Sequence, residues 1–201
     1  LPLYATTHSD TSFTGAQSTA LREPARTIIR RAVAGRDDDQ LIFCGSGATA
    51  AISKLLDLLN LRLPADLSDR HDLLAAIPPA QRPVVFVGPY EHHSNELPWR
   101  ESIARVEVVP LDSNGQLDID VLEKLLQQHA GRPLLIGSFS AASNVTGIRT
   151  DVERVTRLLK QYGALSFWDY AAAAPYVCIR MNGGADTSGM SSEQTSEEVG
   201  G

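Results

Sequence analysis

The sequence predicts an α/β protein with a mainly parallel β-sheet that is covered by helices on both faces. Short apolar runs alternate along the chain with segments whose apolar residues recur at helical spacing. The short runs are apolar throughout rather than at every second position, which is typical of strands buried on both faces. The 201 residues, of which 43% are hydrophobic, can form one sizeable domain or part of a larger one.

The expected elements alternate between helix and strand. In chain order, we expect a helix at about 15–34, a strand at 41–44, a helix at 48–59, a loop with a short helix at 60–82, strands at 83–87 and 105–109, a helix at 117–129, a strand at 134–139, a helix at 152–162 and a strand at 165–168. Pro24 is expected to kink the first helix or to start it. Cys44, inside the first strand, is expected in the core.

The C-terminal segment 182–201 differs from the rest of the chain. It is rich in Gly, Ser, Thr and Glu and has almost no apolar residues. Such a segment cannot bury a core, so we expect residues 1–181 to form the folded domain and 182–201 to be a disordered tail. The abrupt change after Met181 indicates a frame change, a splice variant or a truncation, and an ordinary flexible C-terminus is the alternative.

Charge and cysteine content exclude several classes of protein. A formal net charge of -6 argues against a general nucleic-acid binder. Two cysteines do not make a disulfide framework, which favours a reducing compartment such as the cytoplasm, with an organelle as the alternative. We see no apolar run of membrane-spanning length and no signal peptide, so no membrane partner is expected.

Small and polar residues follow each apolar run, where an open parallel sheet binds its ligands. The first such segment is Gly45–Thr49, whose small residues let backbone N–H groups approach an anion at a helix N-terminus. It lacks the lysine of a phosphate loop and is not a dinucleotide fingerprint. A tight turn with Ser46 or Thr49 as the N-cap is the alternative.

The next two segments supply a histidine and an asparagine. His92 can stack on a flat heteroaromatic ring and exchange protons near neutral pH, so it is the candidate catalytic residue. Its neighbour His93 points elsewhere and no metal-ligand set accompanies the pair, so a surface histidine pair is the alternative and no metal is expected. Asn144 can donate to a phenolic or carboxylate oxygen, and turn formation is its alternative role.

Asp169 is the most informative candidate. A carboxylate directly after Phe167 and Trp168 would be desolvated, which is costly unless a cation or donors meet it. A protonated pyridine nitrogen is such a partner, and the pairing would keep the ring an electron sink. The small residues after Asp169 leave room for a flat ring. Capping of the next turn is the alternative role for this carboxylate.

In combination these segments resemble the class V aminotransferases, fold-type I enzymes that depend on pyridoxal 5'-phosphate (PLP) and include cysteine desulfurases and selenocysteine lyases. The resemblance runs from Leu3 to Met181. Its matching pieces are residues 4–9, 46–49, 91–95 with Pro98 and Trp99, 143–147 and 168–172. It implies a three-layer α/β/α large domain, here incomplete, with PLP as cofactor, an amino-acid substrate and a homodimeric assembly.

The resemblance also implies a role for each candidate residue. The cofactor-binding set is Gly47, Ala48 and Thr49 at the phosphate, His92 on the pyridine ring, Asn144 near the ring hydroxyl and the substrate carboxylate, and Asp169 at the pyridine nitrogen. One departure is Ala172, which stands where desulfurases of this family usually have glutamine.

The second departure concerns lysine. The family's Schiff-base lysine is expected a few tens of residues beyond Asp169, whereas Lys54, Lys124 and Lys160 all precede it. We therefore interpret the chain as a fragment of a cysteine desulfurase-like enzyme that is itself inactive. The alternatives are a non-catalytic truncated isoform or degenerate product that binds PLP weakly or a full-length partner, and a dinucleotide-binding domain. Neither Cys44 nor Cys178 is expected to be a nucleophile.

Overall fold

The computed structural model describes residues 5–7 and 11–182. The chain divides into two compact units. One consists of Leu1–Leu41 with Cys178–Gly201, and the other of Ile42–Val177. Every candidate site residue lies in the second unit.

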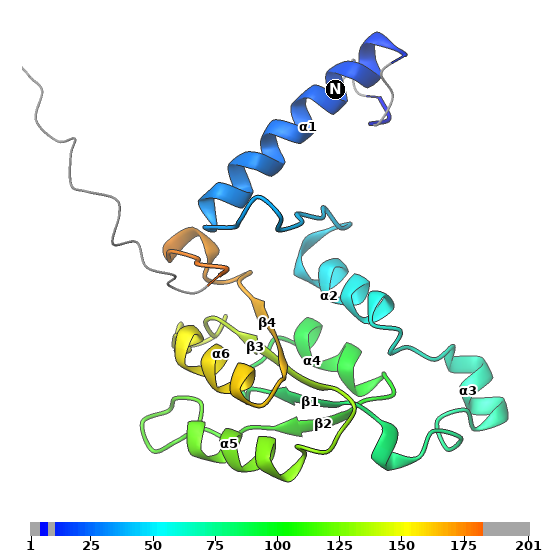
Figure 1. Ribbon diagram of the computed structural model, residues 1–201, viewed down its shortest axis with the longest axis vertical. Coiled ribbons are helices and arrows are strands. Elements are labelled where there is room, and N and C mark those ends of the chain that lie inside the picture. Colours follow the sequence, from blue (N-terminus) through cyan, green and yellow to red (C-terminus); the bar gives the residue numbers. More distant parts are fainter. Residues whose placement is uncertain (1–4, 8–10, 183–201) are drawn as a thin grey trace, which may run out of the picture. The chain divides into compact units, whose positions relative to one another are not determined.

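The second unit contains a parallel sheet of four strands in the order β2-β1-β3-β4, counted over the described residues (Figure 1). The strands are β1 Val84–Val87, β2 Arg105–Val108, β3 Leu135–Ser140 and β4 Leu165–Asp169. The α-helices are α2 Gly47–Leu58, α3 Ala65–His71, α4 His93–Arg100, α5 Ile119–Gln128 and α6 Val152–Gln161. Two short 3-10 helices, Pro79–Gln81 and Ala174–Tyr176, complete the unit. The predicted α/β fold with a parallel sheet is confirmed.

The strand β1 shows why both faces of the sheet are covered. Its four residues are fully buried, and successive side chains point to opposite faces. Val84 and Phe86 belong to a hydrophobic cluster with residues of α5 and α6, whereas Val85 and Val87 belong to a second cluster with residues of α2 and α4. The sheet is therefore the middle layer of three, as the continuous apolar run predicts.

Aspartate caps fix the start of the two helices on the first face. The carboxylate of Asp118 accepts from the Val121 N–H at 2.9 Å in α5, and that of Asp151 accepts from the Arg154 N–H at 3.0 Å in α6. Caps of this kind stabilise a helix by about 1 kcal/mol each. The two crossover helices are thereby held at defined positions between β2 and β3 and between β3 and β4.

The prediction of a strand at 41–44 is wrong. This run is irregular, with Ile42 60% and Phe43 47% exposed, and Cys44 is half-buried. A strand needs a neighbour to satisfy its backbone hydrogen bonds, and none of the described strands pairs with this run. The run also crosses the boundary between the two units. Four described strands therefore replace the five that the sequence predicted.

The helix α4 was not expected from the sequence. It spans eight residues and contains Pro98, so its apolar pattern is too short to stand out. Its buried residues are Asn95 and Trp99, which pack it onto the same face of the sheet as α2.

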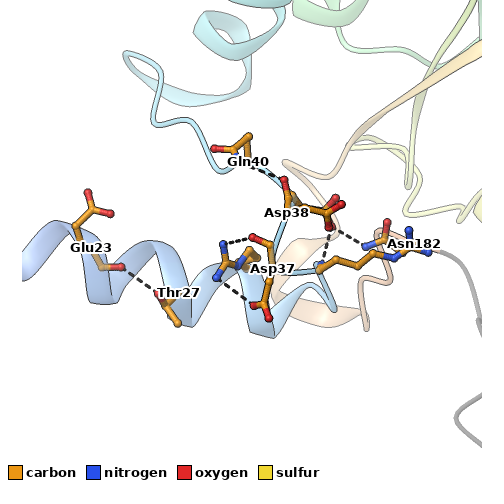
Figure 2. A network of polar contacts seen from close by, with 9 residues as sticks. Glu23, Thr27, Asp37, Asp38, Gln40 and Asn182 are labelled. Atoms are coloured by element: carbon orange, nitrogen blue, oxygen red, sulfur yellow. Dashed lines mark hydrogen bonds and ion pairs between the residues drawn. The ribbon is translucent and has the colours of Figure 1, made fainter.

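The first unit is built on the helix α1, Phe13–Ala32, which Ser12 caps through the Gly15 N–H at 3.1 Å. The helix runs through Pro24, so a helix start at that residue is excluded. Figure 2 shows the polar contacts at its C-terminal end, where Arg30 donates to the carbonyl oxygen of Asp37 at 3.1 Å.

Asn182, the first residue of the predicted tail, is part of the same network (Figure 2). Its amide donates to the carboxylate of Asp39 at 2.7 Å, and this hydrogen bond lowers the pKa of Asp39. The preceding residue Met181 donates its N–H to the Val33 carbonyl at 3.0 Å. The rest of the predicted tail, 183–201, lies outside the described residues.

Candidate functional site

The carboxyl ends of β1, β3 and β4 lie side by side at one edge of the sheet. In the parallel register Val87 of β1 is level with Ser138 of β3, and Ser140 of β3 is level with Asp169 of β4. The sheet therefore brings the segments that follow β1 and β3, which carry His92 and Asn144, to the edge where Asp169 ends its strand.

Asp169 is held by its backbone and by one carboxylate oxygen. Its carbonyl accepts from the Ala141 N–H at 2.9 Å, and its Oδ1 accepts from the Ala171 N–H at 2.8 Å. The second contact is the turn-capping role given above as the alternative. Within the described part of the chain, Oδ2 has no hydrogen-bond partner.

Asp169 is half-buried as a residue, and the hydrogen bond to its Oδ1 is exposed, so the carboxylate is not fully desolvated as the sequence indicated. β4 is the last strand of the described sheet and its first residue Leu165 is 40% exposed. An edge strand has a neighbour on one side only, so its side chains are covered less than those of β1. The apolar run predicts the strand but does not show that it is an outer strand, with a neighbour on one side only.

His92 is the N-cap of α4. Its Nδ1 lies 3.2 Å from the Ser94 N–H and 2.8 Å from the Ser94 hydroxyl, which fixes one side of the imidazole. The ring is exposed, and Nε2 makes no hydrogen bond to a described residue. The His93 ring is 6.1 Å away between centroids, and no group of three possible metal-ligating side chains occurs among the described residues.

Asn144 lies in the turn that follows β3. The turn is held by Ser143, whose Oγ accepts from the N–H groups of Val145 and Thr146 at 3.2 Å each, and by Gly147 in the left-handed region at φ +73°. The Asn144 side chain is exposed and makes no hydrogen bond within the described residues. The turn therefore does not use the Asn144 amide.

The Gly45–Thr49 segment opens α2. Gly47 has φ +68°, and a Cβ there would meet nothing within 4 Å, so the backbone turn rather than a lack of space requires glycine. Ser46 stands at the N-cap, but its side chain makes no capping hydrogen bond. The first N–H groups of α2 therefore have no side-chain cap from Ser46 and carry the positive end of the helix dipole.

Sequence reasoning gave no role to Glu91, which is the most extensively bonded side chain at this edge. Its Oε1 accepts from the N–H groups of Gly88 at 3.2 Å and Ser140 at 3.0 Å, and its Oε2 accepts from the Asn95 amide at 2.7 Å and the Ser140 hydroxyl at 2.6 Å. Burial raises the pKa of Glu91, and these hydrogen bonds oppose the rise. The Glu–Asn pair at i and i+4 was the signal that could have indicated it.

The three lysines lie on helices, where the sequence placed them. Lys54 is on α2, Lys124 on α5 and Lys160 on α6, and all three are exposed to solvent.

Solved structures with the same fold include a cysteine desulfurase and an aminotransferase. The chain is similar to a cysteine desulfurase from Thermococcus onnurineus NA1, with a TM-score of 0.64 and 21% identity, covering 90% of this chain and 40% of that one. It is also similar to an alanine–glyoxylate aminotransferase from Nostoc sp., with a TM-score of 0.54 and 20% identity, covering 82% and 38%. At these identities the likeness shows the fold.

The sequence comparisons then give the family. The family model "Aminotransferase class-V" matches residues 2–192, so the chain belongs to the class V aminotransferase family, which is generally PLP-dependent. A "Probable cysteine desulfurase" of Halalkalibacterium halodurans is 27% identical over 161 residues, which is 78% of this chain and 35% of that protein. A cysteine desulfurase of Synechococcus elongatus is 34% identical over 93 residues, 44% of this chain and 14% of that protein. The chain thus spans well under half the length of these relatives.

Proposed function

We propose that residues 42–177 form one side of a PLP site in a cysteine desulfurase-like enzyme that acts on an amino acid. The observation that carries this proposal is the carboxylate of Asp169 at the carboxyl edge of the sheet, one oxygen of which has no hydrogen-bond partner among the described residues. The Asn144 segment follows the adjacent strand β3, and the His92 segment follows β1, the next strand in the sheet. Membership of the class V family supports the choice of cofactor. A homodimer in the cytoplasm is part of the same proposal. None of the described helices is long and apolar enough to cross a bilayer.

The candidate groups fit the chemistry of PLP. The uncapped first turn of α2 offers N–H donors of the kind that bind a phosphate. Asp169 offers an acceptor for a protonated ring nitrogen, Asn144 a donor for an oxygen, and His92 an exposed flat ring. Ala172 supplies no side-chain donor.

Each side chain then has a defined task in the proposed site. PLP, when bound, supplies an electron sink for the bonds at the α-carbon of an amino acid. Asp169 keeps a proton on the ring nitrogen by pairing with it. His92 covers the ring and can exchange a proton at Nε2, because Nδ1 is engaged by Ser94. Asn144 orients an anionic oxygen, and the first turn of α2 holds the phosphate.

We further propose that the 201-residue chain binds PLP without covalent attachment and is inactive alone. Covalent attachment needs a lysine amine beside the cofactor's aldehyde. Lys54, Lys124 and Lys160 lie on exposed helix faces and not in the segments at the carboxyl edge of the sheet.

The test is a PLP titration of the full chain, followed by absorbance and by calorimetry. Asp169→Asn removes the charge that would pair with the ring nitrogen, and we expect it to weaken binding roughly tenfold. Asp120→Asn, at an exposed position in the first turn of α5, is the matched control and leaves the affinity unchanged. Equal affinities for all three proteins, or no binding to the unchanged chain, would contradict the proposed site.

A further inference from the structure

Glu91 connects the segment after β1 to the neighbouring strand β3. Its two carboxylate oxygens accept four hydrogen bonds, of which two come from Ser140, 49 residues away in the sequence. The other two come from Gly88 and Asn95, on either side of Glu91 in its own segment. The Glu91 side chain thus forms hydrogen bonds within the β1–α4 connection and also links this connection to Ser140, the last residue of β3.

A series of hydrogen bonds runs from Trp99 through Ser138 and Asn95, and it has to end on an acceptor at Glu91. The Ser138 hydroxyl accepts from the Trp99 indole N–H at 3.1 Å, so its own proton goes to the Asn95 side-chain oxygen at 2.7 Å. Asn95 is 1% exposed and its NH2 group is thereby directed at Glu91. Every donor in this buried series points toward the carboxylate, which gives the series one direction.

Gly88 makes the close approach possible. A Cβ built on Gly88 would lie 2.6 Å from Oε1 of Glu91, which is closer than side-chain atoms approach one another. The absence of a side chain at Gly88 lets its N–H reach the carboxylate at 3.2 Å.

The hydrogen bonds between Glu91 and Ser140 lie next to the two proposed ring contacts, His92 and Asp169. Ser140 is paired in register with Asp169 in β4, and Glu91 directly precedes His92, the N-cap of α4. We propose that Glu91 is a positioning residue, which fixes the place of His92 relative to Asp169 by fastening the segment 88–92 to Ser140. The contact of His92 and Asp169 with PLP rests on the proposed function, whereas the fastening itself does not.

The first experiment needs no ligand. In the full chain labelled with 15N-histidine, the His92 imidazole signals are assigned by their loss in His92→Ala. Glu91→Gln places an NH2 group among donors, so we expect the His92 signals to shift or broaden. In a uniformly 15N-labelled sample we expect the Ser140 amide to exchange at least about tenfold faster. Glu96→Gln removes an exposed ion pair with Arg100 on the same helix and should leave both readouts unchanged.

Ser140→Ala is the second variant, because it removes one hydroxyl donor to Oε2 and preserves the volume of the site if Glu91→Gln fails to fold. It should also shift or broaden the His92 signals. Unchanged His92 signals and unchanged Ser140 exchange in the folded variants would overturn the proposal.

The second experiment is a double-mutant cycle on PLP affinity. If Glu91 acts through His92, Glu91→Gln weakens PLP binding roughly tenfold in the unchanged chain but has no further effect in His92→Ala. Additive losses would show that Glu91 acts on binding independently of His92 and would overturn the positioning role. A chain that binds no PLP at all would contradict the proposed function, and the ligand-free experiment would then decide the role of Glu91 alone.

Discussion

Two carboxylates at the same edge of the sheet have different environments. Both residues are half-buried, but Glu91 accepts four hydrogen bonds, whereas Asp169 keeps one oxygen free of described partners. A carboxylate whose lone pairs are all used holds structure together, and one with a free oxygen can meet a ligand. The number of hydrogen-bond partners, rather than the distance from the strands, distinguishes a structural carboxylate such as Glu91 from a candidate ligand-binding carboxylate such as Asp169.

The raised pKa of Glu91 predicts a specific dependence of stability on pH. Below its ordinary value of 4.5 the carboxyl is protonated in both the folded and the unfolded chain. As pH rises from there through the folded pKa, the unfolded chain loses this proton first, so stability falls relative to Glu91→Gln. We expect the free energy of unfolding of the unchanged chain, minus that of Glu91→Gln, to fall across this window and then level off.

Urea unfolding of both proteins between about pH 4 and pH 8 measures this difference. The comparison cancels the titration of the other carboxyls. A difference that is constant or that grows with pH contradicts the raised pKa.

The three exposed lysines predict how the chain reacts with PLP and borohydride. We expect low, distributed labelling of Lys54, Lys124 and Lys160, because exposed amines react similarly and none lies in the segments at the carboxyl edge of the sheet. Peptide mapping by mass spectrometry measures the distribution, and Asp169→Ala should not change it. One lysine labelled stoichiometrically, with labelling lost in Asp169→Ala, would show that the chain forms the covalent site after all.

At the scale of elements, the packing of α6 on β3 depends on one glycine. A Cβ at Gly137 would lie 2.5 Å from a methyl group of Leu159 in α6 and 2.8 Å from the Phe139 ring. Leu159 and Phe139 are both buried in the same hydrophobic cluster, so neither can move without displacing others. The missing side chain lets the helix lie close to the strand that ends at Ser140.

We therefore expect Gly137→Ala to destabilise the fold by roughly 1–3 kcal/mol through overpacking. Gly131→Ala is the matched control, since a Cβ there meets nothing within 4 Å and should change the stability by less than about 1 kcal/mol. Chemical denaturation of the two variants gives the comparison. Equal stabilities would mean that α6 and β3 are separated more widely than the structure shows.

At the scale of the whole molecule, the core belongs to one unit. Both hydrophobic clusters consist of residues of Ile42–Val177, and the four described strands lie there too. The other unit contributes α1 and the segment that returns to it through Met181 and Asn182.

This division predicts that residues 42–177 produced alone retain the α/β circular dichroism spectrum and a cooperative thermal transition. Removal of α1 takes away none of the residues in either cluster. The midpoint temperature of thermal unfolding should therefore stay within a few degrees of that of the full chain. A broad, non-cooperative transition would show that the sheet depends on the first unit.

The sequence by itself determined the fold class, the parallel sheet and the family. The fold class and the parallel sheet follow from local patterns, because a strand buried on both faces is apolar throughout and a crossover helix is apolar on one side. The family follows from the resemblance of the motifs. It also placed Asp169 at the end of a strand and the lysines on helices. The roles of Gly47, Ala48, Thr49, His92, Asn144 and Asp169 toward PLP stay predictions.

Only the tertiary structure decided which residues hold these segments together. The order β2-β1-β3-β4 puts Ser140 beside Asp169 and within reach of Glu91, and no local pattern contains a contact between residues 49 positions apart. The same holds for the run 41–44, whose apolar composition predicts a strand that has no partner among those described. Strand pairing and the satisfaction of buried polar groups depend on neighbours that are distant in the sequence. Local patterns in the amino-acid sequence therefore do not reveal them.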